Sequence, residues 1–349
     1  MEHANQKRKG SAVKKIIAIV VIVVVVALVA VVAIIRKSYS DNLKPVGGNT
    51  NNQVITVEPG STPGQIADDL KAKGLIKSDW AFEWYVRNEQ LRDKLKAGTY
   101  AVNPSQSVSE IVQVIVDGKE ATDLVTILPG KRIDQVKEDL IKAGFAEAEV
   151  TAALDPKQYA DHPALTDKPS DASLEGYIYP ESFQKTAETT VKQVITQSLD
   201  EMDRRLTPEV REAFSKQGLT LHQAIVLASV VENEVSNAAD RAQAAQVFLK
   251  RYKSNIMLGS DSTAVYGSIL AGQGRAILYD TPYNTRLHTG LPPGPISNVG
   301  EGSLKAIAFP AGTDWLYFVS GDDGNTYFSK TLQEHEELTK KHCIELCKI

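Results

Sequence analysis

Hydrophobic residues are spread very unevenly along this chain of 349 residues. Residues 16–35, IIAIVVIVVVVALVAVVAII, form an unbroken apolar run with no polar position. A helix of that length covers the roughly 30 Å hydrocarbon layer of a bilayer, whereas a helix of a soluble domain normally keeps a polar face. The pattern predicts a transmembrane helix over residues 16–35.

Charge on either side of this run predicts its orientation. Five Lys and Arg residues lie in residues 1–15, and only Arg36 and Lys37 follow the run directly. By the positive-inside rule, residues 1–15 form a cytoplasmic basic tail and the rest of the chain lies outside the cytoplasmic membrane. A cleaved signal peptide would have a shorter apolar region ending in small residues, but IIRKSYS follows here. We expect a retained single-pass anchor.

A polar, Gly/Asn-rich stretch without apolar periodicity follows the anchor, and we interpret residues 36–53 as a linker. A repeat comes next. VITVEPGSTPGQIADDLKAKGL, from Val54, aligns at an offset of 70 residues with LVTILPGKRIDQVKEDLIKAGF, from Leu124. Each copy has a β-branched run, a Pro-Gly turn and apolar residues at helical spacing, which predicts a strand-turn-helix unit. Residues 54–150 are therefore expected to form a small βα platform.

Units of this kind resemble LysM-type carbohydrate-binding modules, which pack helices on a small sheet. The resemblance implies binding of N-acetylglucosamine polymers, and the alternative is a purely structural spacer. Trp80 and Trp84 lie four residues apart on one predicted helix face. A pair at this spacing belongs more often to a core than to a sugar-binding surface.

After a loop-rich connection at residues 151–172, the segment SLEGYIYPESF begins a third region, residues 173–337. Its alternating acidic and aromatic residues are typical of surfaces that hold sugar rings, although a half-buried strand would show the same alternation. These residues are Glu175, Tyr177, Tyr179, Glu181 and Phe183.

A strongly apolar helix in this region ends in two glutamates. The run LTLHQAIVLASVVENE is apolar over most of its circumference through Val231, so the helix should be interior. Burial raises a carboxyl pKa, and a general acid must hold a proton near neutral pH. Glu232 and Glu234 lie about 200° apart and cannot share one site. Glu232 lies one turn after the small residues Ala228 and Ser229, which leave room for a ligand. Glu234 is expected to form a local hydrogen bond or to cap a neighbouring helix. For either residue, the alternative is an exposed glutamate near the end of the helix.

Composition narrows the remaining functions. Lys and Arg number 39 against 43 Asp and Glu, and seven of these cations but only one acid lie before residue 38. The remainder of the chain is therefore acidic, and nucleic-acid binding is not expected. The six histidines lack HxxxH or HxH spacing, and neither a Walker loop nor GxGxxG occurs. We therefore expect no metal and no cofactor. Cys343 and Cys347 lie in the tail, residues 338–349, where we expect a frayed helix rather than a strained disulfide.

The ordered motifs LEGYIYPES, ASVVENE, YNT with GLPPGPI, SLKA and LYFV resemble those of the YceG-like (MltG) family of membrane-anchored endolytic murein transglycosylases. The resemblance covers most of the chain. It implies an α+β catalytic domain over residues 173–337, behind a single transmembrane helix and a LysM-like platform. It also implies cleavage of the MurNAc-β-1,4-GlcNAc bond of peptidoglycan with 1,6-anhydro ends, termination of strand growth, and association with peptidoglycan synthases.

Residue roles follow from the same resemblance. Glu232 matches the catalytic glutamate, which would serve as acid and then as base. Glu175 would orient Glu232 or bind substrate, and Gly290 to Pro295 would form a rigid wall of the groove. The substrate-binding residues implied are Glu175, Tyr177, Glu181, Asp261, Tyr266, Tyr283, Asn284, Thr285, Pro292 and Pro293.

Two positions depart from the family pattern, because Ser262 and Val299 stand where a Pro is usual. The Ser262 departure leaves the rigidity of that loop open. Two other functions also remain open. A hydrolase would need a second carboxylate, for which Glu175 and Glu181 are candidates, and a binding scaffold would hold glycan without cutting it.

Overall fold

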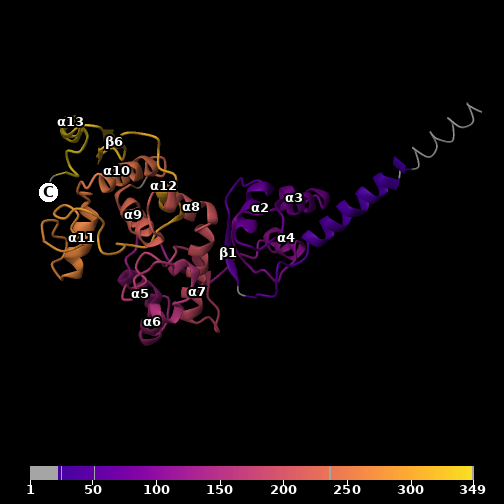
Figure 1. Ribbon diagram of the computed structural model, residues 1–349. Coiled ribbons are helices and arrows are strands. Elements are labelled where there is room, and N and C mark those ends of the chain that lie inside the picture. The colour runs from indigo at the N-terminus through magenta and orange to yellow at the C-terminus, as the bar shows by residue number, and fades with distance from the viewer. Residues whose placement is uncertain (1–22, 25, 51, 236, 348–349) are drawn as a thin grey trace, which may run out of the picture. The chain divides into compact units, whose positions relative to one another are not determined.

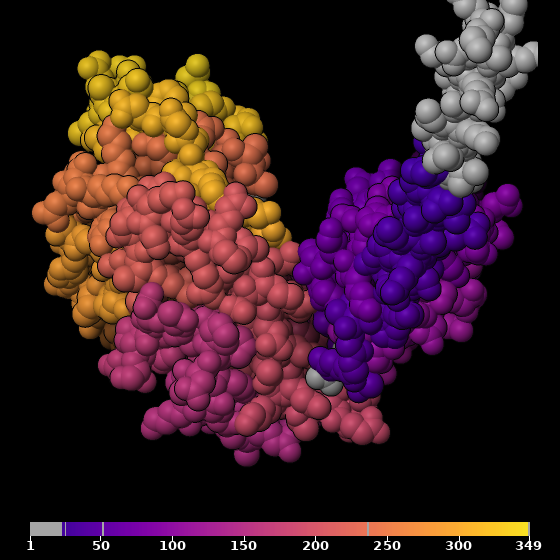
Figure 2. Space-filling view, turned by 45° about the vertical axis from the view of Figure 1, so that its right-hand side comes forward, coloured from indigo at the N-terminus to yellow at the C-terminus, as the bar shows by residue number. Residues whose placement is uncertain are grey.

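The computed structural model describes residues 23–24, 26–50, 52–235 and 237–347. The chain divides into two compact units, an N-terminal unit up to Thr122 and a C-terminal unit from Asp123 (Figure 1). Each unit has its own hydrophobic core, and the space-filling view shows the surface of each by residue number (Figure 2). The mixture of helices with short sheets agrees with the predicted α+β class.

Residues 16–22 and 25 of the expected transmembrane segment lie outside the described residues. Within the part of the chain that is described, no helix combines the length and the apolar character needed to cross a membrane.

The N-terminal unit packs helices against a two-stranded antiparallel sheet. Its strands are β1 (Gln53–Val57) and β2 (Gly98–Val102), and its helices are α2 (Pro63–Ala72), α3 (Asp79–Asn88) and α4 (Val108–Asp117). Thr62 and Gln65 form a reciprocal capping box at the start of α2. Leu70 of α2, Phe82 of α3 and Tyr100 of β2 are fully buried between sheet and helices. The first copy of the repeat therefore folds as the predicted strand-turn-helix unit.

The segment predicted as a linker is attached to this unit instead. Residues 26–42 are helical, and Leu43 packs against the core of the N-terminal unit. The Leu43 carbonyl accepts a hydrogen bond from the N–H of Val108 at 3.0 Å, and the N–H of Gly47 donates to Pro104 at 3.1 Å. One partly buried leucine and a few backbone hydrogen bonds therefore hold a segment whose composition is typical of a linker.

The C-terminal unit is built around one buried helix, α9 (Leu221–Glu234), which packs against α8, α10, α11 and α12 (Figure 1). It also contains short two-stranded antiparallel sheets. Its helices are α5 (Ile133–Lys142), α6 (Glu147–Ala153), α7 (Val191–Arg205), α8 (Pro208–Lys216), α9, α10 (Arg241–Lys253), α11 (Asp261–Leu270), α12 (Glu301–Ala308) and α13 (Leu332–His342), and its strands are β3 (Leu124–Thr126), β4 (Ser182–Gln184), β5 (Tyr317–Ser320) and β6 (Thr326–Ser329).

The second copy of the repeat also folds as strand and helix, β3 and α5, but it belongs to the C-terminal unit. Strand β3 pairs with β4, with Val125 opposite Phe183. Val136 and Leu140 of α5 lie in the core of that unit. The two units thus divide after Thr122, whereas the repeat pattern placed the end of the platform at residue 150. Similar local sequence does not reveal which partner strand each copy pairs with.

Gly176 brings two loops of the C-terminal unit into contact. Its φ is +84°, and a Cβ built there would lie 2.4 Å from Cβ of Pro295. Both the backbone conformation and the missing side chain are therefore required for the 290–295 loop to pack on residues 173–179.

We expect Gly176→Ala to lower the stability of the C-terminal unit by about 2–4 kcal/mol, because a left-handed φ and an overlap with Pro295 both oppose the methyl group. Gly218→Ala is the matched control, since Gly218 also has positive φ but no neighbour within 4 Å, and should cost only about 1 kcal/mol. Urea unfolding followed by circular dichroism measures both. Equal losses in the two variants would contradict the packing argument.

Candidate active site

Three successive polar residues end the buried helix α9. Glu232, Asn233 and Glu234 follow a stretch from Ala224 to Val231 that is buried throughout. Each residue of a helix is turned by about 100° from the one before. The three side chains therefore point in different directions, and each one contacts a different loop.

Glu232 lies in a polar environment. Its Oε2 accepts the N–H of Gly300 at 3.0 Å, and its Oε1 lies 3.3 Å from Nη2 of Arg241. The side chain is only 5% exposed. Gly300 is the N-cap of α12, where helix N–H groups favour a negative charge. The burial agrees with the sequence prediction, but the surroundings differ: a guanidinium and an N–H interact favourably with the charged carboxylate.

The space beside the small residues that precede Glu232 is occupied by another segment of the protein rather than left open for a ligand. Ser229 is fully buried, and its Oγ accepts the N–H of Ile296 at 3.0 Å. The chain around Ile296 thus fills the space that we expected to be open.

Glu234 caps a neighbouring helix, as the sequence predicted. Its Oε1 accepts the hydroxyl of Ser260 at 2.6 Å and the N–H of Ser262 at 3.2 Å. These residues lie at the start of α11. A proline at position 262 would have no N–H to donate. Ser262 therefore holds this loop through a hydrogen bond where the family pattern has a proline.

Asn233 lies between the two glutamates and lines a cavity of about 320 Å³. Its Nδ2 donates to Ser297 Oγ at 2.6 Å and to the carbonyl of Ser229 at 2.9 Å. Asn233 is not among the site residues predicted from the sequence, although it is the middle residue of the ENE motif. The cavity is lined by Gly130, Arg132, Gln135, Asn233, Asp261, Ser262, Val265, Tyr266, Ile269, Arg275 and Ile296.

Glu175 also carries a buried carboxyl group, and the residue is 5% exposed. Its oxygens accept the N–H of Ile133, at the start of α5, at 3.1 Å, and Oε2 accepts the hydroxyl of Tyr266 at 3.0 Å. Burial raises its pKa from 4.5 to about 7, against the opposing effect of these hydrogen bonds. Its partners are thus Ile133 and Tyr266, rather than Glu232 as one sequence hypothesis held.

Tyr266 connects Glu175 to the cavity. It belongs to α11, lines the cavity and packs its ring against Tyr283, with ring centres 4.8 Å apart. Burial and the neighbouring Glu175 raise the pKa of Tyr266. Close to the Tyr283 hydroxyl lies Gly294, where a Cβ would be 3.1 Å from that oxygen. The 290–295 loop therefore lies beside this tyrosine pair.

Several predicted substrate-binding residues are buried in the protein interior and bonded to other residues there. Tyr177 is fully buried, and its hydroxyl lies 2.7 Å from Nδ1 of His222. Asn284 is fully buried and donates to the carbonyls of Ile277 and Tyr279. Thr285 is 2% exposed and bonds Thr263 at 2.7 Å. These three residues shape the loops behind the site, and their burial argues against the expectation that they contact substrate directly.

The remaining predicted substrate-binding residues lie in different parts of the C-terminal unit. Asp261 pairs with Arg286 and lines the cavity. Glu181 accepts the N–H of Ser182 next to it, at the start of β4. Pro292 is buried and Pro293 is exposed. Tyr266 and Asp261 thus line the cavity, and Glu175 lies directly behind Tyr266.

The sequence profile of the YceG-like family matches residues 55–341. This chain belongs to the YceG-like family. It is 30% identical over 319 residues to a Bacillus subtilis protein named endolytic murein transglycosylase, covering 86% of this chain and 88% of that protein. A Streptococcus pneumoniae protein of the same name is 27% identical and is covered over 60% of its length. A crystal structure of a YceG-like protein from Listeria monocytogenes covers 83% of this chain and all of its own, with a TM-score of 0.55 and 29% identity.

The C-terminal tail of this YceG-like chain contradicts the predicted frayed helix. Helix α13 ends at His342, and Cys343 and Cys347 form a disulfide beyond it. The Asp322 carboxylate accepts the N–H groups of residues 344–346 at 2.7–2.9 Å. The predicted strain assumed a continuous helix, and the chain leaves the helix just before the first cysteine.

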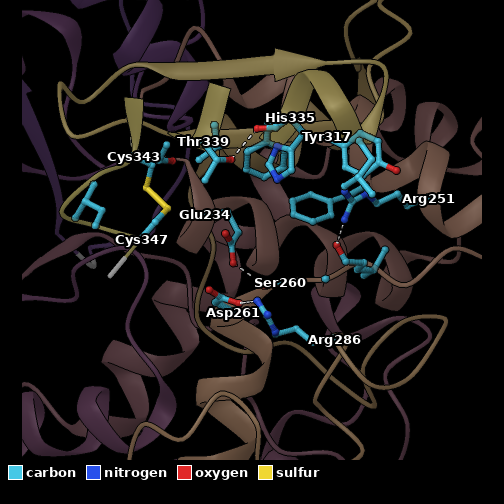
Figure 3. A pocket seen from close by; sticks show the side chains of 18 residues that line it. Glu234, Arg251, Ser260, Asp261, Arg286, Tyr317, His335, Thr339, Cys343 and Cys347 are labelled. Atoms are coloured by element: carbon cyan, nitrogen blue, oxygen red, sulfur yellow. Dashed lines mark hydrogen bonds and ion pairs between the residues drawn. A yellow bond between two sulfur atoms is a disulfide. The ribbon is translucent and has the colours of Figure 1, made fainter. Parts of the chain in front are cut away.

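This disulfide borders a second cavity of about 520 Å³ (Figure 3). Glu234, Asp261 and Arg286 lie on one side of it, and Tyr317 with His335 on another. Asp261 lines both cavities. Among the described residues of this YceG-like chain, no group of three or more His, Cys, Asp or Glu side chains is placed to hold a metal ion.

The raised pKa of Glu175 predicts a pH-dependent stability. The folded state binds the proton of the Glu175 carboxyl group more tightly than the unfolded state does. Protonation of Glu175 therefore stabilises the fold fully below pH 4.5, and this contribution disappears as the pH rises through about 7. We expect wild type to lose about 3 kcal/mol relative to Glu175→Gln across this interval.

Chemical denaturation of both proteins at a series of pH values measures the difference. Glu212→Gln is the control. Lys216 lowers the pKa of Glu212, so wild type should gain stability relative to Glu212→Gln as the pH rises. A pH-independent difference between wild type and Glu175→Gln would show that Glu175 is not protonated in the folded state.

Proposed function

We propose that this protein is a lytic transglycosylase that cleaves the MurNAc-β-1,4-GlcNAc bond within peptidoglycan glycan strands and leaves 1,6-anhydro-MurNAc ends. The observation that carries the proposal is the match, along 86% of the chain, to proteins named endolytic murein transglycosylase. Cleavage within nascent strands ends their elongation. Peptidoglycan synthases, which make these strands, are the partners we propose.

We propose Glu232 as the acid and base. As acid, its carboxyl group gives a proton to the glycosidic oxygen while the bond from C1 to that oxygen breaks. As base, the resulting carboxylate takes the proton of the C6 hydroxyl as this oxygen bonds to C1. The carboxyl group is then protonated again, and no water is consumed. The hydrogen bond from Gly300 and the ion pair with Arg241 support the negatively charged form between the two proton transfers.

The polar cavity beside Asn233 supports sugar binding. Arg132, Gln135 and Arg275 offer hydrogen-bond donors, and Tyr266 offers an aromatic surface. We propose that the glycan lies along this cavity, with Asp261 at its edge. Glu175 holds Tyr266 in place through the hydrogen bond to its hydroxyl.

We also propose that the protein is anchored in the cytoplasmic membrane by residues 16–35, with its amino terminus inside. The described part of this segment exposes its apolar side chains, among them Val26 at 62%, Val29 at 64% and Ile34 at 67%. A helix whose large apolar side chains face outward is stable in lipid rather than in water. The helices packed on a two-stranded sheet in the N-terminal unit support a LysM-like role in glycan binding.

Glu232→Gln should reduce strand cleavage at least about a hundredfold, because an amide cannot supply the proton. The glutamine oxygen can still accept the N–H of Gly300, so the fold should persist. The exposed Glu209→Gln on α8 is the control and should cut at the wild-type rate.

Mass spectrometry of purified murein digested by the full chain in detergent distinguishes the functions. Anhydro ends support the transglycosylase, reducing ends would identify a hydrolase, and an absence of products would identify a binding scaffold. If Glu232→Gln cuts normally while Glu175→Gln does not, the proton donor is Glu175.

A further inference from the structure

Three aromatic side chains gather on the N-terminal unit where the N-terminal helix ends. Tyr39 of that helix lies near Trp80 and Trp84 of α3, with ring centres 6.0 and 6.5 Å apart. The two tryptophans are 44% and 52% exposed, so the prediction that they lie in the core is wrong. An indole ring has a large apolar surface and a polar N–H group. Two such rings exposed on one helix face are therefore best accommodated at an interface between apolar and aqueous surroundings.

The N-terminal helix and α3 are held together by more than the rings. Nζ of Lys77, just before α3, reaches the carbonyl of Asp41 at 3.4 Å. Leu43 directly follows the helix and packs against the core of the unit. The position of α3 relative to the helix is therefore fixed by the fold.

The position of Tyr39 along the helix sets the depth of the cluster. Ile35 is the last residue of the apolar run, and Tyr39 lies four residues later, about 6 Å further along the axis. The headgroup region extends about 5–7 Å beyond the hydrocarbon on each side of a bilayer. Arg36 and Lys37 lie between, at the depth where cations meet lipid phosphates. Trp and Tyr are enriched at this depth.

We propose that the N-terminal unit docks on the outer surface of the membrane by placing Trp80 and Trp84 among the lipid headgroups. This inference rests on the proposed membrane anchor. The anchor then does more than retain the protein, because it holds the N-terminal unit against the bilayer in one orientation. The favoured occupant of the tryptophan surface is lipid rather than glycan, because Tyr39, which completes the surface, belongs to the anchor helix itself.

Tryptophan fluorescence tests this docking. The chain has three tryptophans, so Trp315→Phe in the full chain leaves Trp80 and Trp84 as the only emitters. The protein is reconstituted into vesicles of phosphatidylethanolamine and phosphatidylglycerol that carry a nitroxide either at the headgroup or near the end of an acyl chain. We expect the headgroup nitroxide to reduce emission about twofold and the deep nitroxide to have little effect. Vesicles without nitroxide give the reference, and Trp80→Phe and Trp84→Phe assign the quenching to each ring.

Alkaline extraction of the same vesicles separates this proposal from the proposed anchor. A chain that resists extraction but is not quenched from the headgroup would overturn the docking and leave the anchor standing. A chain that is extracted would overturn both. N-acetylglucosamine oligomers are added to the protein in detergent micelles as a second test. If these oligomers change the tryptophan emission, and the headgroup nitroxide leaves the emission in vesicles unchanged, the surface binds glycan and the docking is overturned. Murein cleavage, measured separately, reports on the proposed catalysis in every case.

Discussion

A helix that is buried on every side must still end somewhere, and in this protein the end of α9 organises the site. Its last three residues are polar and point in three directions. Glu232 contacts the start of α12, Asn233 contacts Ser297, and Glu234 contacts the start of α11. Three segments around the candidate active site are therefore positioned by hydrogen bonds to the same helical turn.

This arrangement gives the site two carboxyl groups with opposite surroundings. Glu232 faces a guanidinium and an N–H at a helix start, whereas desolvation dominates at Glu175. In the proposed reaction the acid must first carry a proton and then act as a base. The ion pair with Arg241 and the hydrogen bond from Gly300 suit the second of these roles, in which the carboxylate is charged.

Much of the fold could be predicted because it depends on local patterns. The repeat gave two strand-turn-helix units, and the helical position of Glu234 indicated a local cap. The burial of Tyr177, Asn284 and Thr285 could not be predicted, since polar and aromatic residues occur both on sugar-binding surfaces and inside hydrogen-bonded loops. Arg241 as partner of Glu232, and Leu43 as the residue that fixes the linker, depend on tertiary contacts that a single sequence does not display.

The contact between Gly176 and Pro295 bears on how this family could be recombined in the laboratory. Because the backbone of one segment rests on the pyrrolidine ring of the other, the two behave as matched parts. A chimera that imports the 290–295 loop from a relative must also import the segment around position 176, or the loop will be displaced from its position beside Tyr283.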